Sequence, residues 1–164
     1  MILELFWFFL PAGVANIVPR LVSKINFLGN PINEKLFGSH KTWRGLIFGV
    51  LAAIIFVFIQ KLIGWDSIVD YSSVNVILLG FLLGFGGIFG DVIKSYFKRR
   101  VGIAPGKSWI PFDQIDFVLG GLVFVFWYVD LSVIQALIIF LMYSLLHPIV
   151  NYIAYLLKIQ KNKL

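Results

Sequence analysis

The chain has 164 residues, of which 60% are hydrophobic and only 13% are charged. A soluble domain has about 45–50% apolar and about 25% charged residues, so this chain has too few polar side chains to cover a surface in water. The composition therefore excludes an ordinary soluble domain and predicts an integral membrane protein. A spanning helix needs about 20 residues, so five spans would use about 100 and leave no room for a separate soluble domain.

Five apolar segments are predicted to be transmembrane helices, at about 2–18, 45–62, 75–98, 111–129 and 131–157. Proline removes a helical hydrogen bond, so Pro11 with Gly13 is expected to kink the first segment. His147-Pro148 is expected to break the last segment for the same reason. The first segment lacks the features of a cleaved signal peptide and is expected to be retained. We therefore predict an all-α polytopic membrane protein that forms a single domain over residues 1–164.

The basic residues alternate between the predicted loops. The loops after the first and third spans and the C-terminal tail together hold 13 of the 14 Lys and Arg residues, and the remaining one is Lys61. Basic loops mark the cytoplasmic side, which predicts a cell-membrane protein with its N-terminus outside and its C-terminus in the cytoplasm. The net charge of +6 is thereby explained without a nucleic-acid partner. Glycine pairs such as Gly80 and Gly84 are interpreted as helix packing within one chain, so no obligate protein partner is expected.

Three aspartates are predicted at the cytoplasmic ends of spans. Asp91 lies about 17 residues, or about 25 Å, into the third span, where a carboxylate at the edge of the hydrocarbon is costly. Asp113 and Asp116 share one face at the start of the fourth span. Each aspartate has a structural alternative. For Asp91 it is an ion pair with Lys94 or with a residue of another helix, and for the other two it is a favourable helix N-terminus. Together, three carboxylates at one depth predict a site for one or two Mg²⁺ ions.

Basic and hydroxyl side chains accompany these acids. They are Lys41, Thr42 and Arg44 in the first loop, Ser95, Lys98 and Arg99 at the end of the third span, and Lys107 in the next loop. The cytoplasmic-side signal alone explains most of these cations taken singly. Acids that bind Mg²⁺ beside bases that bind phosphate are, however, what polyphosphate chemistry needs. Asn16, at the depth of Asp91, is a further candidate for lining the site, whereas His40 and His147 are interpreted as a solvated loop residue and a hydrogen-bonded helix residue.

Three other functional interpretations have weaker support: a P-loop nucleotide site, a transporter and a scaffold. Segment 102–108 superficially matches a P-loop, but it has three residues between its glycines where four are needed, and no strand precedes it. A small-ion or anion transporter is the main alternative to an enzyme, and it should carry ionisable residues near the midplane. The midplane stretches of the second, third and fourth spans have no charge. A purely structural or scaffolding membrane protein is the third alternative, and it would not explain why three acids lie beside a Lys-Arg-Arg sequence.

The motifs of the third and fourth spans resemble those of a known family. Ser95-Tyr-Phe-Lys98-Arg99-Arg100, Pro105-Gly106-Lys107 and Pro111-Phe-Asp113-Gln-Ile-Asp116 resemble the signature of CDP-diacylglycerol synthases. The short chain, with His40-Lys41-Thr42-Trp43-Arg44-Gly45 and Gly90-Asp91, is more similar to the archaeal branch, the CDP-archaeol synthases. The chain departs from the bacterial signature at Ser108 and at 110–112, and it has Asn33 where the archaeal branch has an aspartate.

The resemblance implies a cytidylyltransferase. A membrane lipid phosphate would attack the α-phosphorus of CTP, pyrophosphate would leave, and a CDP-activated lipid would remain. The archaeal branch implies 2,3-bis-O-geranylgeranyl-sn-glycerol 1-phosphate as acceptor, and an ester-lipid phosphatidate cytidylyltransferase is the alternative. The implied roles are Mg²⁺ binding by Asp91, Asp113 and Asp116, phosphate binding by Lys98, Arg99 and Lys107, and nucleotide binding by Lys41, Thr42 and Arg44, with Ser95 also contacting substrate.

Overall fold

The computed structural model describes residues 1–65, 68–104 and 107–156. These residues form helices and loops, and the only pairing of extended backbone among them is a single bridge between Pro31 and Thr42. The predicted all-α class is therefore confirmed. The helices are α1 (Ile2–Leu21), η1 (Val22–Lys24), α2 (Glu34–Phe37), α3 (Trp43–Ile63), α4 (Val76–Arg100), α5 (Phe112–Val125) and α6 (Val133–Leu156).

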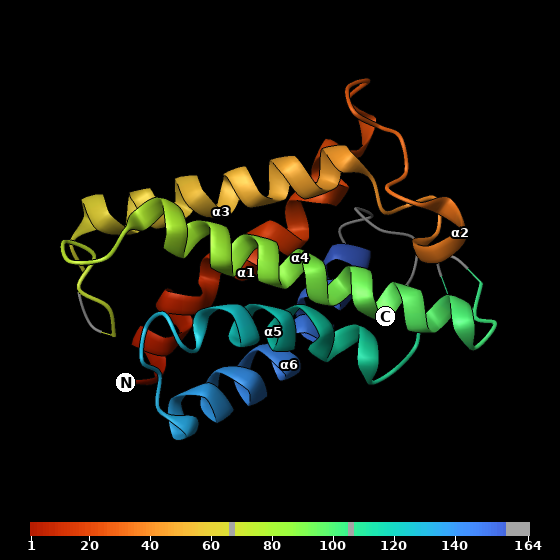
Figure 1. Cartoon of the computed structure of the whole chain (residues 1–164). Helices are drawn as coiled ribbons and strands as arrows, with labels where there is room; N and C mark the ends of the chain where they lie inside the picture. Colours follow the sequence, from red (N-terminus) through yellow and green to blue (C-terminus); the bar gives the residue numbers. More distant parts are fainter. Residues whose placement is uncertain (66–67, 105–106, 157–164) are drawn as a thin grey trace.

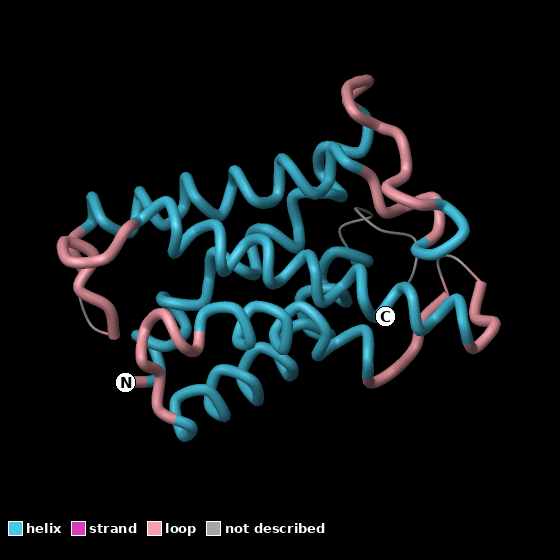
Figure 2. Tube along the Cα trace, in the orientation of Figure 1, coloured by secondary structure: helices cyan, strands magenta, loops and turns pink. Residues whose placement is uncertain are grey.

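The five long helices run alternately in opposite directions, with α4 at the centre (Figure 1). Helix α4 packs against α3 on one side and α5 on the other, while α1 contacts all four other long helices. The connecting loops gather at the two ends of the bundle (Figure 2). At one end the backbone N–H of Asn75 donates to the Tyr128 hydroxyl at 3.0 Å. At the other end α2 packs against α4, so the described parts of the two predicted basic loops share one end.

Four helical segments are long and apolar enough to cross a membrane: Ile2–Lys24, Trp43–Ile63, Val76–Arg100 and Val133–Ile153. The predicted segments at 45–62 and 75–98 agree closely with α3 and α4. The segment predicted at 111–129 is shorter in the structure, because α5 ends at Val125 and a turn follows. With 14 residues α5 is about 21 Å long, whereas a bilayer core is about 30 Å thick.

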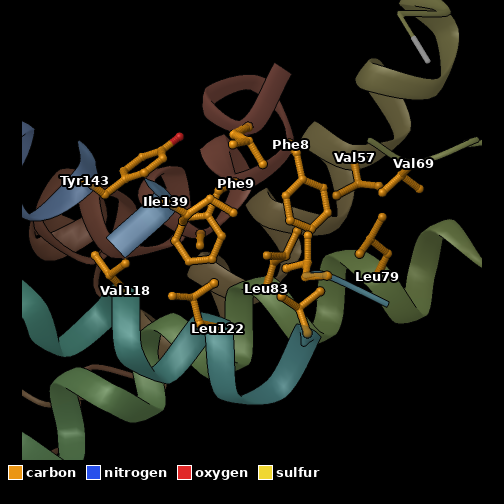
Figure 3. Packing of buried hydrophobic residues seen from close by; sticks show 14 of the residues in the cluster. Phe8, Phe9, Val57, Val69, Leu79, Leu83, Val118, Leu122, Ile139 and Tyr143 are labelled. Atoms are coloured by element: carbon orange, nitrogen blue, oxygen red, sulfur yellow. The ribbon is translucent and has the colours of Figure 1, made fainter. Parts of the chain in front are cut away.

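The core lies where α1 meets the other long helices, and it is apolar (Figure 3). Its fully buried side chains include Phe8, Leu83 and Val118. Helix α1 continues through Pro11, which has no N–H to offer the Trp7 carbonyl four residues earlier. The buried side-chain amide of Gln60 donates to that carbonyl instead. A neighbouring helix therefore supplies the hydrogen bond that the proline removes.

The last helix is not interrupted at His147-Pro148, where a kink or break was expected. Helix α6 continues through Pro148, as prolines do in membrane helices where other groups satisfy the freed backbone. On this turn of α6 the Asn151 side chain contacts the His147 ring, with Nδ2 lying 3.4 Å from Nε2. The Arg20 guanidinium of α1 donates to Asn151 Oδ1 at 3.0 Å, which fastens this part of α6 to α1.

Glycines bring α4 and α5 into backbone contact. A Cβ atom placed on Gly90 would overlap the Asp116 carbonyl oxygen, and one placed on Gly120 would overlap the Gly86 carbonyl oxygen. Only a residue without a side chain fits at such positions. The expected packing role of the glycines within one chain is thus confirmed at this crossing. Since Asp91 follows Gly90 directly, the same contact sets the distance between the acids of α4 and α5.

Candidate active site

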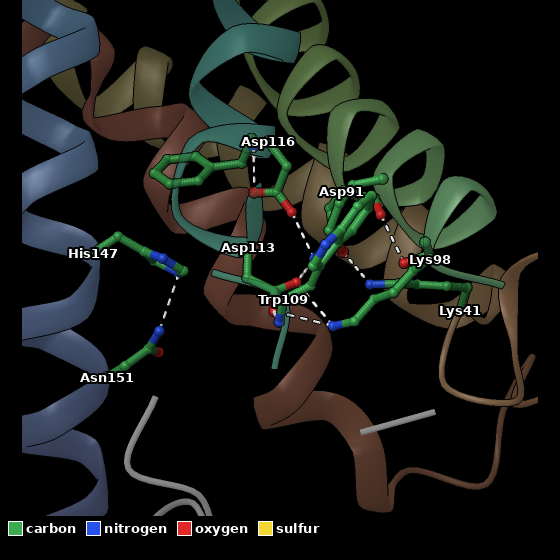
Figure 4. Close-up of polar contacts among 11 residues, drawn as sticks. Lys41, Asp91, Lys98, Trp109, Asp113, Asp116, His147 and Asn151 are labelled. Atoms are coloured by element: carbon green, nitrogen blue, oxygen red, sulfur yellow. Dashed lines mark hydrogen bonds and ion pairs between the residues drawn. The ribbon is translucent and has the colours of Figure 1, made fainter. Parts of the chain in front are cut away.

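Lys94 of α4 is the centre of a cluster of charged side chains. Its Nζ atom lies 3.0 Å from Asp91 Oδ1, 2.7 Å from Asp113 Oδ1 and 2.7 Å from Asp116 Oδ2. Asp91 is one turn earlier on α4, and the other two acids are in the first two turns of α5. The predicted convergence of the three carboxylates is therefore present, and the Lys94 ammonium joins them. Figure 4 shows the three acids together.

Two further lysines complete the cluster. Lys41, from the loop before α3, is paired with Asp91. The Lys98 ammonium donates to both oxygens of Asp113 at 3.0 Å, and this lysine is only 6% exposed. Three lysines and three aspartates give a formal charge of zero. Because an unpaired charge is costly where it is shielded from water, this balance lowers the cost of holding six charged side chains together.

Backbone and hydroxyl groups fix the carboxylates and their helices. The Trp109 N–H donates to Asp113, and the Phe117 N–H donates to Asp116 Oδ1 at 2.6 Å. The peptide bond between Ile110 and Pro111 is cis at the start of α5. The Ser95 hydroxyl donates to the Asp91 carbonyl at 2.8 Å and is almost fully buried. Ser95 thus contacts its own helix rather than open space.

The cluster has the donor chemistry of a magnesium site. Carboxylate oxygens are hard ligands that suit Mg²⁺, and here three of them already lie within 3.0 Å of one cationic nitrogen. Among the described residues, no group of three His, Cys, Asp or Glu side chains forms a ready ligand set. The point where the acids meet is held by Lys94. Asp91, Asp113 and Asp116 are the residues that could hold a divalent cation, and they would meet around one only in an arrangement in which the Lys94 side chain lies elsewhere.

Other predicted residues make local contacts. The Thr42 hydroxyl accepts from the Gly45 N–H at 3.2 Å and caps α3. The Arg44 guanidinium donates to the Ile25 carbonyl and so holds the first loop against α3. Arg99 is half-buried, and its Nε and Nη1 atoms are buried without a hydrogen-bond partner in the described residues. Arg99 therefore has unused donors at the charged end of α4.

The remaining predicted residues make no hydrogen bond or ion pair to the cluster among the described residues. Asn16 is half-buried and makes no hydrogen bond or ion pair to the cluster within the described ranges, while Lys107 is exposed in the loop before α5. Pro105 and Gly106 of the proposed motif fall outside the described residues. His40 is exposed and His147 contacts Asn151, as their sequence contexts indicated.

Two features of the site could not be predicted from the spacing of residues in the sequence. Asn33, where an aspartate was expected, caps α2 by accepting from the Leu36 N–H at 3.1 Å. The sequence indicates Lys94 as a partner of Asp91, because the two are three residues apart on one helix. Its contacts with Asp113 and Asp116 depend on how closely the glycines let α5 approach, and no local pattern encodes that approach.

Fold and site together define a polytopic helical membrane protein with a partly buried acid–lysine cluster at one end of its bundle. The chain belongs to the CDP-archaeol synthase family, described as CarS-like, whose sequence profile matches residues 1–163. The family suggested by the sequence motifs is therefore confirmed, and the chain is an enzyme.

Curated relatives carry the same name over nearly their whole length. CDP-archaeol synthase of Thermococcus onnurineus is 36% identical over 159 residues, which cover 92% of this chain and 89% of the relative. The CDP-archaeol synthase of Pyrococcus furiosus is 31% identical over 166 residues, which cover 96% of this chain and 95% of the relative. The one of Methanocaldococcus jannaschii is 33% identical over 167 residues, with 94% and 92% covered. No solved structure matches the chain significantly.

Proposed function

We propose that the enzyme transfers CMP from CTP to an archaeal ether-lipid phosphate, 2,3-bis-O-geranylgeranyl-sn-glycerol 1-phosphate, to form CDP-archaeol and pyrophosphate. One observation carries the proposal: three carboxylates and three lysines from α4, α5 and the first loop meet at one point. In such a set the carboxylates can bind a metal ion and the lysines can bind phosphate oxygens. The relatives named CDP-archaeol synthase support the same product.

The reaction needs little acid–base chemistry. An anionic oxygen of the lipid phosphate forms a bond to the α-phosphorus of CTP, the bond between the α-phosphorus and the bridging oxygen breaks, and pyrophosphate leaves with that oxygen. The protein therefore acts by positioning and by stabilising negative charge. Bound Mg²⁺ would supply Lewis-acid stabilisation of the phosphate charge.

The residues divide into three roles under this proposal. Asp91, Asp113 and Asp116 hold Mg²⁺. Lys98, Arg99 and Lys107 bind the anionic oxygens of the triphosphate or of the lipid phosphate. Lys41, Thr42 and Arg44 form the nucleotide side of the site, with Ser95 fixing the end of α4 and Asn16 lining the site from α1.

The topology follows from the same proposal. We place the whole chain in the cell membrane as a single domain of five spans, with α5 as a short fifth span. The N-terminus lies outside, and the C-terminus and the cluster lie on the cytoplasmic side, where the basic loops and CTP would meet. The buried core cluster around Phe8, Leu83 and Val118 holds no charged side chain among the described residues, which supports an enzyme over a transporter with ionisable residues at that depth.

A transfer assay with a matched pair of variants tests the proposal. Purified protein is incubated with labelled CTP, Mg²⁺ and either the ether-linked or an ester-linked lipid phosphate, and labelled CDP-lipid and pyrophosphate are measured. Asp113→Asn should retain the fold and lose about 100-fold or more in turnover. Asp130→Asn, an equal change in the exposed turn after α5, should leave turnover unchanged. Product from the ester lipid alone would refute the substrate, and no product from either lipid would refute the enzyme activity.

A further inference from the structure

The loop that follows α1 exposes a group of apolar side chains. Ile25, Phe27 and Leu28 are 45%, 58% and 41% exposed, and every residue from 23 to 30 is exposed. We call residues 23–30 the apolar loop. It directly follows the first candidate span, which ends at Lys24. Because water solvates apolar groups poorly, such a group on a surface marks a place of contact with a protein or a membrane.

Hydrogen bonds hold the apolar loop in a defined shape. The Arg44 guanidinium donates to the Ile25 carbonyl, and the Arg44 backbone N–H donates to the Leu28 carbonyl at 2.8 Å. The Trp43 N–H donates to the Asn30 carbonyl at 3.2 Å. Leu28 has a φ of 49°, a conformation that a bulky residue keeps only where its surroundings hold it. The start of α3 therefore fixes the backbone of the loop while the apolar side chains stay exposed.

The apolar loop lies at the level where a membrane surface is expected. Helix α3 has 21 residues and is about 31 Å long, which matches a hydrocarbon core about 30 Å thick. Its first residue is the exposed Trp43, and tryptophan is enriched where hydrocarbon meets headgroups. In Figure 1 the loop stands out beyond α3 across the helix axes, whereas α4 reaches further along them. The loop therefore continues the lipid-facing surface of the bundle sideways at this level.

The charges around the apolar loop suit an anionic surface. Between residues 20 and 33 the chain has two cations, Arg20 and Lys24, and no acid. Lys24 is exposed, and Arg44 is a third cation in contact with the loop. A lysine at a membrane surface is attracted to anionic headgroups while its aliphatic stem stays beside hydrocarbon. A loop with exposed apolar and basic side chains and no acid is thus complementary to such headgroups.

We propose that the apolar loop is an interfacial anchor: it inserts Ile25, Phe27 and Leu28 into the membrane surface, and Lys24 binds anionic lipid headgroups. Continuity with the lipid-facing surface and the complementary charge favour a lipid surface over a second copy of the chain or another protein. The irregular backbone of the loop needs water for its polar groups, so the loop stays in the interface, where amphipathic segments lie about 5–10 Å deep. The inference goes beyond the proposed reaction and does not depend on it.

Spin labels measure the depth of the loop without using turnover. The chain has no cysteine, so Asn26→Cys in the apolar loop and Glu34→Cys on α2, both at exposed positions, each carry one nitroxide. The labelled proteins are reconstituted into vesicles of phosphatidylcholine and phosphatidylglycerol, and collisions with oxygen and with a water-soluble nickel chelate are measured by electron paramagnetic resonance. The label at 26 should lie about 5–10 Å below the lipid phosphates, and the label at 34 should lie in water.

Two other results of this measurement would overturn the inference. If both labels collide equally often with the nickel chelate, the apolar loop lies in water. If the label at 26 is shielded from both oxygen and nickel, the loop contacts protein, such as a second copy of the chain.

Variants of the protein labelled at residue 26 test which groups hold the loop in the membrane. Phe27→Gln should bring the label to the level of the phosphates, a shift of about 5 Å or more, whereas Leu36→Gln, at an exposed apolar residue of α2, should leave it in place. Lys24→Gln, or vesicles without phosphatidylglycerol, should move the label in the same direction as Phe27→Gln. An unchanged depth in Phe27→Gln would overturn the insertion, and a depth independent of lipid charge would overturn the binding of anionic headgroups.

Discussion

Two adjacent glycines of α4 test whether backbone contact with α5 holds the site together. Gly86 and Gly87 are both buried in the same helix, but they face different neighbours. A Cβ on Gly86 would lie 2.7 Å from the Gly120 carbonyl oxygen, which belongs to backbone and cannot turn away. A Cβ on Gly87 would lie 3.4 Å from the Ala12 carbonyl oxygen, which is an ordinary contact.

The two alanine variants differ in one energetic contribution only. Both gain about 1 kcal/mol because alanine favours a helix over glycine. Gly86→Ala must also move α5 by about 0.7 Å to restore ordinary contact, and such overpacking costs about 1–3 kcal/mol. Gly87→Ala should therefore be as stable as the parent protein or more so, and Gly86→Ala should be less stable than Gly87→Ala by about 1–3 kcal/mol. That displacement also draws Asp113 and Asp116 away from Lys94.

Thermal unfolding in detergent measures the difference. For a chain of this size 1 kcal/mol corresponds to about 2–4 °C in Tm, so Gly86→Ala should unfold at least about 2 °C below Gly87→Ala. The same preparations are assayed for CMP transfer, which should fall in Gly86→Ala and persist in Gly87→Ala. Equal stability and equal activity of the two variants would refute the argument that the α4–α5 backbone contact sets the geometry of the cluster.

Three further predictions concern separate parts of the molecule. Lys41→Gln removes the tie between the first loop and Asp91, so KM for CTP should rise about tenfold or more in steady-state assays, and an unchanged KM would contradict a nucleotide-side role. Removal of divalent cations with EDTA should abolish CMP transfer and added Mg²⁺ should restore it, whereas transfer that persists under chelation would exclude the metal role of the acids. Gln60→Leu leaves the Trp7 carbonyl without its donor and should lower the unfolding free energy by about 0.6–1.7 kcal/mol with activity retained, and an unaltered Tm would show that this hydrogen bond is dispensable.

Much of the fold was predictable because a bilayer restricts the options. Long apolar segments must form helices there, so the bounds of α3 and α4 follow from composition and from charged or polar residues at their ends. The loop charges also predicted which loops share an end. The end of α5 was less predictable, because its apolar sequence continues past Val125 to Val129 although the helix does not. Hydropathy therefore predicts the position of an apolar segment better than the residue at which its helix ends.

The candidate site was predictable in its members but not in its connections. Acids at one depth and lysines beside them could be read from spacing along α4 and α5. The central place of Lys94 could not, because it depends on contacts between helices that only the glycine crossing permits. Thr42 shows the converse case: a residue singled out for binding caps a helix in the structure. A hydroxyl near a basic motif suits both purposes, and sequence alone does not separate them.

The balance of charges in the cluster suggests how substrates and metal depend on one another. With three lysines and three aspartates paired, the free enzyme can keep all six groups together in a partly buried place. Mg²⁺ alone would compete with Lys94 for the carboxylates and leave an excess of positive charge in a partly buried site, which is unfavourable. A triphosphate that arrives with the metal offers the released lysines new anionic partners. Metal and CTP should therefore bind much more tightly together than either does alone, and the cluster's neutrality before binding is the physical reason.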